Sequence, residues 1–379
     1  MPPIDTSSLV AQIHDSGAQM VLAATGGGSG AISALFSVPG ASRSMLLATV
    51  PYADTALVEW LGARPEQFCS AKTARAMAMA AYEKAQRLCP TGQRLIGIGC
   101  TASLASDRPK RGPHRLFVAV QTAGSTACLE LELEKDRRTR AEEESLATLC
   151  ILNEIADACG LADRLPLPTV AAETPHRQFL QAPDEWRAVL AGQIKRVAIG
   201  PPQNTEVIFP GAFNPRHVGH QRMAEVASRK LGRPVAYELS VTNVDKPSLD
   251  FMDIQQRLQQ FSADETVWLT HAPTFLEKAR TFPGAVFVVG VDTVDRIAEQ
   301  RYYENDLYEM LRVFDRIAHT GCKFLVFGRL MDGRFKTLDN LLLHKTLDDC
   351  CLKVPESEFR EDTSSTEVRQ NPEASPPGP

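Results

Sequence analysis

Two histidines stand three positions apart in the segment FPGAFNPRHVGH, which spans 209–220. On the first turn of a helix His217 and His220 would share one face, because residues three apart are neighbours there. Their imidazoles could then donate hydrogen bonds to the oxygens of an α-phosphate as negative charge builds up in a transition state. Gly211 would let the backbone approach a ligand, and Gly219 would let both histidines approach the same phosphates. The segment therefore predicts a phosphoryl-type transfer, which needs positioning, charge stabilisation and usually Mg²⁺.

The elements around this segment predict where it lies. A buried strand at 207–209 precedes it and a helix at 219–231 follows it. Beyond them we expect further apolar strands at 235–241, 266–270, 286–289 and 323–327, alternating with helices at 253–261, 274–280 and 308–319. This alternation indicates an α/β, Rossmann-like fold with a parallel, doubly wound sheet. Ligands of such sheets bind beyond the carboxyl ends of the strands, where a helix N-terminus suits phosphate. An isolated histidine pair would more often cap and pack a helix, but the glycines and the preceding strand favour a site.

The segment at 209–220 resembles the HxGH nucleotidylyltransferases, and among them the nicotinamide/nicotinate mononucleotide adenylyltransferases. Four later segments are similar to motifs of that branch, in the same order: NVDKP at 243–247, PTF at 273–275, GVDT at 290–293 and SSTEVR at 364–369. The resemblance implies catalysis by His217 and His220. It also implies a nucleotide- and phosphate-binding set comprising Gly211, Phe213, Asn214, Gly219, Lys246, Gly290, Asp292, Ser364, Ser365, Thr366 and Arg369. Thr274 and Phe275 would line the substrate site, and Mg²⁺ would accompany ATP, with no metal ligand expected from the protein itself.

The N-terminal half carries a different motif, TGGGSG at 25–30. Successive backbone N–H groups of such a loop can form a nest for an anion, so the loop could cradle a phosphate. It is not a Walker A loop, because no Gly-Lys-Ser/Thr follows. A tight turn between a strand and a helix explains the same residues equally well. We expect strands at 21–24, 115–121 and 127–133 and helices at 31–36, 69–88 and 141–159 around it.

The pattern around this loop resembles the CinA C-terminal family, the nicotinamide-nucleotide amidohydrolases. The similarity covers the loop at 23–28, a turn at 39–42, a stretch at 49–57, a second glycine-rich loop at 99–115 and an Asp-Arg pair at 136–137. It implies a pocket formed by Thr25, Gly26, Gly27, Gly28 and Tyr52. Thr25 stands where the family has its nucleophilic serine, and Leu57 where it has the activating lysine. A hydroxyl nucleophile needs a base or a lowered pKa, so we predict that this half binds a ligand or mediates assembly without hydrolysis.

Composition and length limit the kind of protein. The 379 residues are 44% hydrophobic and 23% charged, as in globular proteins, and the length predicts two domains. We expect a CinA-like domain at 1–163, a proline-rich linker at 164–204, the transferase domain at 205–370 and a disordered tail at 371–379. The net charge of −5 argues against a nucleic-acid partner, and no apolar run approaches the roughly 18 residues of a membrane helix. Without a signal-peptide pattern or a CxxC pair, we expect a cytoplasmic protein with neither disulfides nor a zinc site.

The two resemblances concern the same kind of mononucleotide. The expected function is therefore transfer of an adenylyl group from ATP to a mononucleotide such as nicotinamide or nicotinate mononucleotide, with release of pyrophosphate. One alternative within the class is another phosphate acceptor or CTP as donor. Another is a nucleotide-binding sensor or scaffold without turnover, against which His217, His220, Asp292 and Arg369 argue. The assembly habit of the amidohydrolase family implies a homo-oligomer.

Overall fold

The computed structural model describes residues 4–90, 94–107, 110–201, 206–331 and 333–361. The chain divides into two compact units. The first comprises Met1–Arg187 together with Asp245–Asp253, and the second comprises Ala188–Val244 and Ile254–Pro379. The short segment 245–253 therefore belongs to the first unit although the chain on both sides of it belongs to the second. Among the described residues, no helix has both the length and the apolar character needed to cross a membrane.

The first unit contains a six-stranded sheet in the order β2-β1-β3-β4-β5-β6. Its strands are β1 (Gln19–Thr25), β2 (Met45–Thr49), β3 (Leu95–Ser103), β4 (His114–Thr122), β5 (Ser125–Leu133) and β6 (His176–Gln181). The first three strands pair in parallel and the last four in antiparallel fashion. The predicted strands at 21–24, 115–121 and 127–133 are confirmed as parts of β1, β4 and β5.

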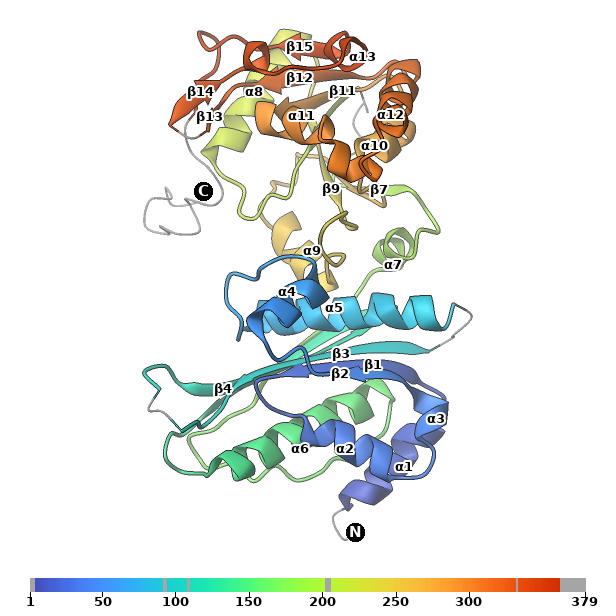
Figure 1. The fold of residues 1–379 in the computed structure, drawn as a ribbon, viewed down its shortest axis with the longest axis vertical. Coiled ribbons are helices and arrows are strands. Elements are labelled where there is room, and N and C mark those ends of the chain that lie inside the picture. Colours follow the sequence, from blue (N-terminus) through green and yellow to red (C-terminus); the bar gives the residue numbers. More distant parts are fainter. Residues whose placement is uncertain (1–3, 91–93, 108–109, 202–205, 332, 362–379) are drawn as a thin grey trace. The chain divides into compact units, whose positions relative to one another are not determined.

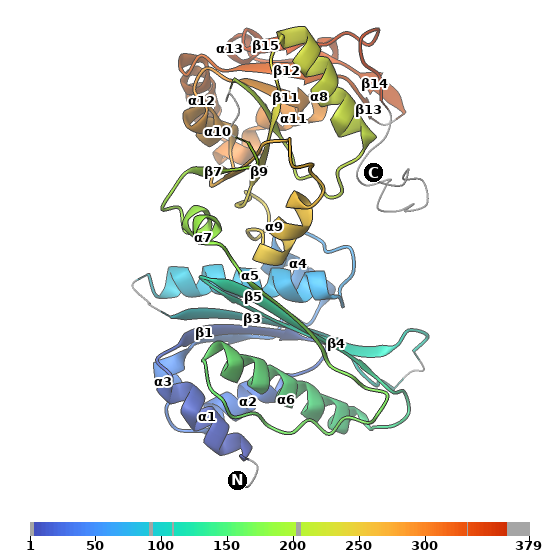
Figure 2. The same ribbon diagram turned by 180° about the vertical axis from the view of Figure 1, so that it is seen from behind.

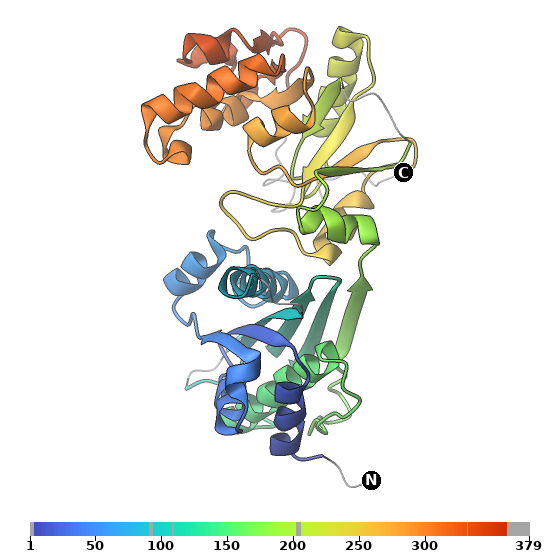
Figure 3. The same cartoon turned by 90° about the vertical axis from the view of Figure 1, so that its right-hand side faces the viewer.

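Helices cover both faces of this sheet (Figure 1). They are α1 (Thr6–Asp15), α2 (Gly30–Ser37), α3 (Ala41–Ser44), α4 (Asp54–Leu61), α5 (Ala71–Leu88) and α6 (Arg140–Ala158). Helices α4 and α5 lie on one face, and α1, α2 and α6 lie on the other, as Figure 3 shows with α5 (light blue) seen nearly end-on. The largest apolar cluster of this unit fills the layer between the sheet and α1, α2 and α6.

Strand β3 is absent from the sequence-based expectation, and two glycines explain why. Gly97 and Gly99 interrupt the apolar pattern, and glycine in a strand usually marks the close approach of another backbone. Here that backbone belongs to α5. A Cβ at Gly97 would lie 2.1 Å from the carbonyl oxygen of Ala78, and one at Gly99 would lie 2.3 Å from that of Ala74. The glycines therefore allow the alanine-rich helix to pack directly onto the central strand.

The second unit contains a seven-stranded sheet in the order β15-β12-β11-β8-β9-β10-β7. Its strands are β7 (Arg196–Ile199), β8 (Val207–Pro210), β9 (Ala236–Ser240), β10 (Val267–Thr270), β11 (Val286–Gly290), β12 (Lys323–Phe327) and β15 (Cys351–Lys353). All neighbours pair in parallel except the edge strand β7, which is antiparallel to β10. The predicted parallel, doubly wound sheet is confirmed.

Helices cover both faces of this second sheet as well. The helices of this half are α8 (Val218–Leu231), α9 (Phe251–Leu258), α10 (Phe275–Thr281), α11 (Val291–Ile297), η1 (Gln300–Tyr303), α12 (Leu307–His319), η2 (Leu338–Asn340) and α13 (Lys345–Asp348). Helices α10, α11 and α12 cover one face, and α8 covers the other, which faces the viewer in Figure 2. A small hairpin, β13 (Arg329–Met331) with β14 (Arg334–Lys336), follows β12.

The expected linker at 164–204 contains regular structure. Strand β6 is an edge strand of the first sheet, helix α7 (Asp184–Leu190) follows it, and β7 is an edge strand of the second sheet. Every side chain of β6 except that of Leu180 is exposed, because an edge strand on the outside of a sheet buries little. The segment therefore lacks the apolar alternation by which a strand is recognised in a sequence.

Candidate functional site

The histidine segment lies where the strand order of the second sheet changes direction. From β8 the chain adds β9 and β10 on one side, and β11, β12 and β15 on the other. Strand β8 pairs with β9 as far as Pro210, whereas its pairing with β11 ends at Ile208 opposite Phe287. In open α/β sheets, ligands bind beyond the carboxyl ends of the strands at such a switch point. The histidine segment follows β8, and the Gly290–Asp292 motif follows β11.

The two histidines form the first turn of α8, as the sequence predicts. His217 is the N-cap residue, and its ring centroid lies 3.8 Å from that of His220. The backbone N–H of His217 donates a hydrogen bond of 3.2 Å to Nδ1 of His220. Burial lowers the pKa of His220 to about 3, helped by the charges of His217, Arg216 and Arg329. A neutral ring that accepts through Nδ1 carries its hydrogen on Nε2, so His220 has one donor left for a ligand.

Gly219 gives room to the ring of His217. A Cβ at this position would lie 3.0 Å from two atoms of that ring and 3.2 Å from Cγ of Glu361. Both distances are shorter than ordinary van der Waals contacts. The absence of a side chain at Gly219 thus lets the His217 ring lie against the helix turn that also carries His220.

Gly211 and Phe213 serve the packing beneath His220. Phe213 adopts a left-handed backbone conformation (φ 44°), and only 1% of it is exposed. Its ring meets His220 edge-on at 5.1 Å and Phe261 at 5.3 Å. A Cβ at Gly211 would lie 2.6 Å from Cζ of Phe213. The sequence assigns both residues to the nucleotide, but the structure places the Phe213 ring in the space over Gly211, where it packs against His220.

Arg216 fixes the loop from the other side. Its guanidinium lies between the rings of Tyr237 and Phe261, 4.7 and 4.6 Å from their centroids, and forms an ion pair with Glu265. Its backbone N–H donates to Oε1 of Gln260 at 2.7 Å. These contacts use the arginine beside the histidines as an anchor of the backbone rather than as a phosphate ligand.

Asp292 forms an ion pair with Arg329, a residue that the sequence analysis did not identify. Arg329, the first residue of β13, donates to Oδ2 of Asp292 at 2.8 Å. A Cβ at Gly290 would lie 2.4 Å from Oδ1 of Asp292, so the glycine gives the carboxylate its space. The charge of Arg329 also contributes to the lowered pKa of His220. A basic residue two positions after the buried strand at 323–327 was the signal, because it had to lie near the carboxyl edge of the sheet.

The chain approaches the histidine turn a second time near residue 361. Glu358 pairs with Lys230 near the end of α8 at 2.9 Å, and Glu361 pairs with Arg222 near its start at 2.6 Å. The segment therefore runs along α8 towards its N-terminus. The predicted phosphate ligands Ser364, Ser365, Thr366 and Arg369 lie outside the described residues, shortly after this point in the sequence.

The predicted substrate residues have local roles in the structure. Thr274 caps α10 through reciprocal hydrogen bonds with Glu277, and the half-buried ring of Phe275 packs on Phe287 and Phe324. Asn214 lies half-buried in the histidine loop, and Lys246 is exposed in the segment that belongs to the first unit.

Two hydroxyl groups near the end of β9 were not predicted as site residues. The oxygens Oγ of Ser240 and Oγ1 of Thr242 are buried and have no hydrogen-bond partner among the described residues. Buried polar groups nearly always have partners, and these two hydroxyls follow the carboxyl end of a strand next to β8. They are therefore candidates for contact with a substrate.

The glycine-rich loop of the first unit is occupied by a side chain of the protein itself. The carboxylate of Glu144, on α6, accepts hydrogen bonds from the backbone N–H of Gly28 (3.0 Å) and Gly30 (3.2 Å) and from the hydroxyl of Ser29 (2.9 Å). Burial acts to raise the pKa of Glu144, but these hydrogen bonds outweigh it and the pKa is lowered. The predicted anion nest thus exists, and its anion is an internal carboxylate.

Other residues of the predicted N-terminal pocket are packed or turned outward. A Cβ at Gly26 would lie 1.9 Å from the carbonyl oxygen of Ala102, and one at Gly27 would lie 2.5 Å from the side chain of Leu104. The buried hydroxyl of Thr25 donates to the carbonyl of Pro51 at 3.0 Å, while Tyr52 is 69% exposed. In the structure the loop is a tight strand-to-helix turn against β3.

Comparison with known families identifies the second half. Residues 208–371 match the model of a family described as cytidylyltransferase-like. This part of the chain is a nucleotidylyltransferase domain. We call 208–371 the transferase domain below. The sequence-based prediction of a nucleotidyl-transferring enzyme is confirmed in this general form.

Solved structures similar to part of the chain include competence- or damage-inducible proteins and CinA superfamily proteins. They include the competence/damage-inducible protein CihA from Agrobacterium tumefaciens, with 20% identity, 42% of this chain and 98% of that chain covered and a TM-score of 0.35. A competence- or damage-inducible protein from Enterobacter asburiae has 17% identity, with 41% and 99% covered and a TM-score of 0.34. A CinA superfamily protein from Escherichia coli has 18% identity, with 40% and 84% covered and a TM-score of 0.32. None of the curated proteins compared with the chain matches it.

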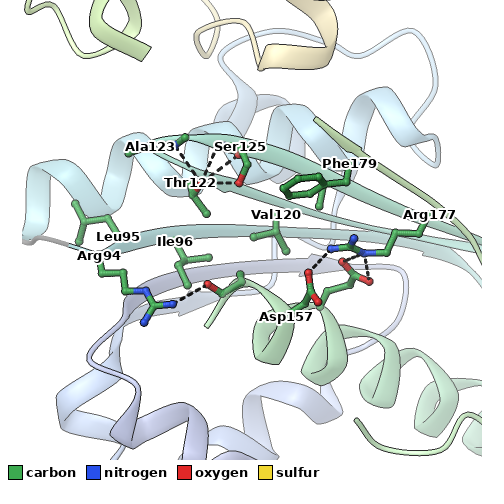
Figure 4. A pocket seen from close by; sticks show the side chains of 14 residues that line it. Arg94, Leu95, Ile96, Val120, Thr122, Ala123, Ser125, Asp157, Arg177 and Phe179 are labelled. Carbon is green, nitrogen blue, oxygen red and sulfur yellow. Dashed lines mark hydrogen bonds and ion pairs between the residues drawn. The ribbon is translucent and has the colours of Figure 1, made fainter. Parts of the chain in front are cut away.

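A cavity of about 340 Å³ lies in the first unit between the sheet and α6 (Figure 4). Two arginines that line it donate hydrogen bonds to oxygen atoms of the protein. Arg177 donates to Glu154 at 3.0 Å and to Asp157 at 2.6 Å, and Arg94 donates to the carbonyl of Ala158 at 3.4 Å. The lining does not include the glycine-rich loop, so the cavity is separate from the predicted N-terminal pocket.

We expect the 379-residue protein to release no ammonia from nicotinamide mononucleotide. The Thr25 hydroxyl is buried and donates to a carbonyl, and its extra methyl group crowds the path of attack. Leu57, where the resemblance expects the activating lysine, is 2% exposed within an apolar cluster, and leucine cannot accept a proton. An enzyme-coupled ammonium assay on wild type and Thr25→Ala should give the same background. Ammonia release that disappears in Thr25→Ala would overturn this prediction.

Proposed function

We propose that the transferase domain moves an adenylyl group from ATP to the phosphate of a mononucleotide such as nicotinamide or nicotinate mononucleotide, and releases pyrophosphate. The observation that carries the proposal is the pair of stacked histidines at the N-terminus of α8, one of them neutral with a donor on Nε2. They lie at the switch point of a parallel sheet, where phosphate ligands bind.

In this reaction an oxygen of the acceptor's phosphate attacks the α-phosphorus of the donor. The bond from that phosphorus to the bridging oxygen breaks, and pyrophosphate leaves with the electron pair. Negative charge accumulates on the oxygens around the α-phosphorus and on the leaving group, where His217 and His220 can donate hydrogen bonds. Mg²⁺ enters as part of the donor, a Mg²⁺–nucleotide complex, and neutralises phosphate charge.

Arg329 and Asp292 extend the proposed donor site. A guanidinium is suited to phosphate, and a carboxylate to the hydroxyls of a ribose. Their ion pair of 2.8 Å holds each side chain beside the end of β11. A bound nucleotide could replace this ion pair with its own contacts to the two side chains. We further propose that Ser364, Ser365, Thr366 and Arg369 hold donor phosphates. In support, the described chain reaches Glu361 beside the histidine turn, only three residues earlier in the sequence.

For the acceptor, the proposal rests on the order of the sequence segments and on two hydroxyls. Segments at 243–247 and 273–275 follow β9 and β10, on the side of β8 away from Asp292. The buried hydroxyls of Ser240 and Thr242 lie near the end of β9 on this side and could bond to a ribose or a base.

A second candidate is cytidylyl transfer from CTP, which the description of the matched family favours. A panel of assays decides between them: the purified 379-residue protein with Mg²⁺, each of the four ribonucleoside triphosphates, and phosphate acceptors that include nicotinamide and nicotinate mononucleotide. We expect pyrophosphate release and a dinucleotide product with ATP and a pyridine mononucleotide. Turnover with CTP alone would replace the proposed donor. Nucleotide binding without turnover for any pair would favour a sensor.

A further inference from the structure

The hairpin of β13 and β14 carries three basic residues on one of its faces. In an antiparallel pair, residues directly opposite each other lie on the same face, and successive residues of a strand alternate between the two faces. Arg329 stands opposite Lys336, and Met331 stands opposite Arg334. Because positions 329 and 331 are two apart, these four residues share one face of the hairpin, which we call the basic face.

Two contacts show where the basic face points. Arg329 donates to Oδ2 of Asp292 at 2.8 Å, and Met331 packs against the apolar cluster that also contains residues of β11 and α11. The other face of the hairpin is closed by its own packing, since a Cβ at Gly328 would lie 2.6 Å from Cε1 of Phe335. The basic face is therefore the one that adjoins Asp292.

Two of the three cations on this face have no anionic partner in the described part of the chain. Asp292 forms an ion pair with Arg329, whereas neither Lys336 nor Arg334 forms an ion pair or a side-chain hydrogen bond with a described residue. Lys336 is half-buried, and Arg334 is exposed. Like charges directly opposite each other destabilise a strand pair, and Lys336 stands opposite Arg329. A bound polyanion would relieve this repulsion and stabilise the hairpin.

The excess positive charge lies beside the proposed donor site. Asp292 follows the carboxyl end of β11, and the charge of Arg329 helps to lower the pKa of His220, so the basic face is within electrostatic range of the histidine turn. A donor that reaches from a ribose contact at Asp292 to the histidines brings its triphosphate to this part of the sheet edge. The β- and γ-phosphates carry most of the donor's charge and bind best to cations. A lysine suits them as a point charge on a flexible stem.

We propose that Lys336 binds the β- and γ-phosphates of the donor nucleotide, and with them the pyrophosphate that leaves, while Arg334 on the same face attracts the incoming triphosphate. This inference rests on the proposed function for the identity of the anion as a donor nucleotide. Inorganic pyrophosphate contains the same two phosphate groups and tests the site without turnover.

The test compares Lys336→Met with Lys323→Met in the 379-residue protein. Lys323 is exposed at the amino end of β12 and donates to the carbonyl of Asp349 at 2.9 Å, so its replacement removes the same charge from the opposite edge of the same sheet. Calorimetry with Mg²⁺ should show that Lys336→Met weakens the binding of inorganic pyrophosphate about 10-fold, the scale of one charge-assisted hydrogen bond. Lys323→Met should bind pyrophosphate as the wild type does.

Nucleotides locate the contact along the phosphate chain. Whichever of ATP and CTP binds more tightly should also lose about 10-fold in Lys336→Met, whereas the matching monophosphate, which lacks the β- and γ-phosphates, should lose much less. Lys336→Arg keeps the charge and should weaken binding less than Lys336→Met. In steady-state assays, KM for the donor should rise in Lys336→Met, and KM for the acceptor should not.

Equal pyrophosphate affinity in the wild type and in folded Lys336→Met would overturn the inference. So would a wild type that binds no pyrophosphate, or an equal loss for the triphosphate and the monophosphate. Should Lys336→Met fail to fold, Lys336→Gln decides by the same criteria. A wild type without turnover on any donor and acceptor would refute the proposed function, while the pyrophosphate titration would still decide the role of Lys336.

Discussion

Replacement of His217 or His220 by alanine should lower kcat for nucleotidyl transfer by about 10²-fold or more, the usual effect of losing a donor to a transition state. The two rings stack at 3.8 Å, and each would donate only when charge develops at the α-phosphorus. Substrate binding should therefore change much less than kcat. Initial rates of pyrophosphate release, together with binding measured by calorimetry, separate the two effects.

The exposed His319 at the end of α12 supplies the matched control, since His319→Ala removes the same side chain from the same unit. The pH profile gives an independent check. With a pKa of about 3, His220 is neutral from pH 8 down to pH 5, so its protonation should cause no loss of activity in that range. Near-normal turnover in both alanine variants would show that the site has been assigned to the wrong residues.

Arg329→Met should also reduce kcat/KM strongly, by about 10²-fold, because it removes a cation from the proposed donor site. The ion pair with Asp292 makes the effect testable as a coupling. If both side chains act on the donor through their shared position, the double variant of Arg329→Met and Asp292→Asn should lose less transition-state stabilisation than the sum of the losses in the two single variants.

Arg312 is the control for the loss of an arginine, because it is exposed on α12 and pairs with Glu309 in the same unit. Arg312→Met should behave as wild type. Should Arg329→Met keep its kcat/KM for every donor in the panel, the contribution of Arg329 would be structural only.

The sequence predicted the turn that carries the two histidines because the turn is local. His217, Gly219 and His220 are adjacent in the chain, and a buried strand followed by a helix fixes their geometry without reference to distant residues. The parallel sheet was predictable for a related reason. Strands buried on both faces are almost wholly apolar, and such runs are visible in a single sequence.

Contacts between residues far apart in the sequence could not be predicted in this way. Arg329 meets Asp292 across 37 positions and Glu144 enters the glycine loop across 116. Neither pairing leaves a periodic signal. The glycine loop shows the difficulty most clearly, because a nest for phosphate and a nest for an internal carboxylate require the same backbone. Only the position of α6 decides between them.

The segment Asp245–Asp253, which belongs to the first unit, affects the order in which the chain can fold during synthesis. Arg75 is synthesised 175 positions before its partner Asp250, so the first unit cannot complete its ion pairs until residues 245–253 have emerged from the ribosome. By then the residues of β8, α8 and β9 in the other unit have already been synthesised. The halves therefore have to mature together rather than in sequence, as separate domains usually do. Cutting the gene between 187 and 188 would leave one fragment without Asp250 and Asp253, the ion-pair partners of Arg75, and a fragment ending near Asp163 would also lack the edge strand β6.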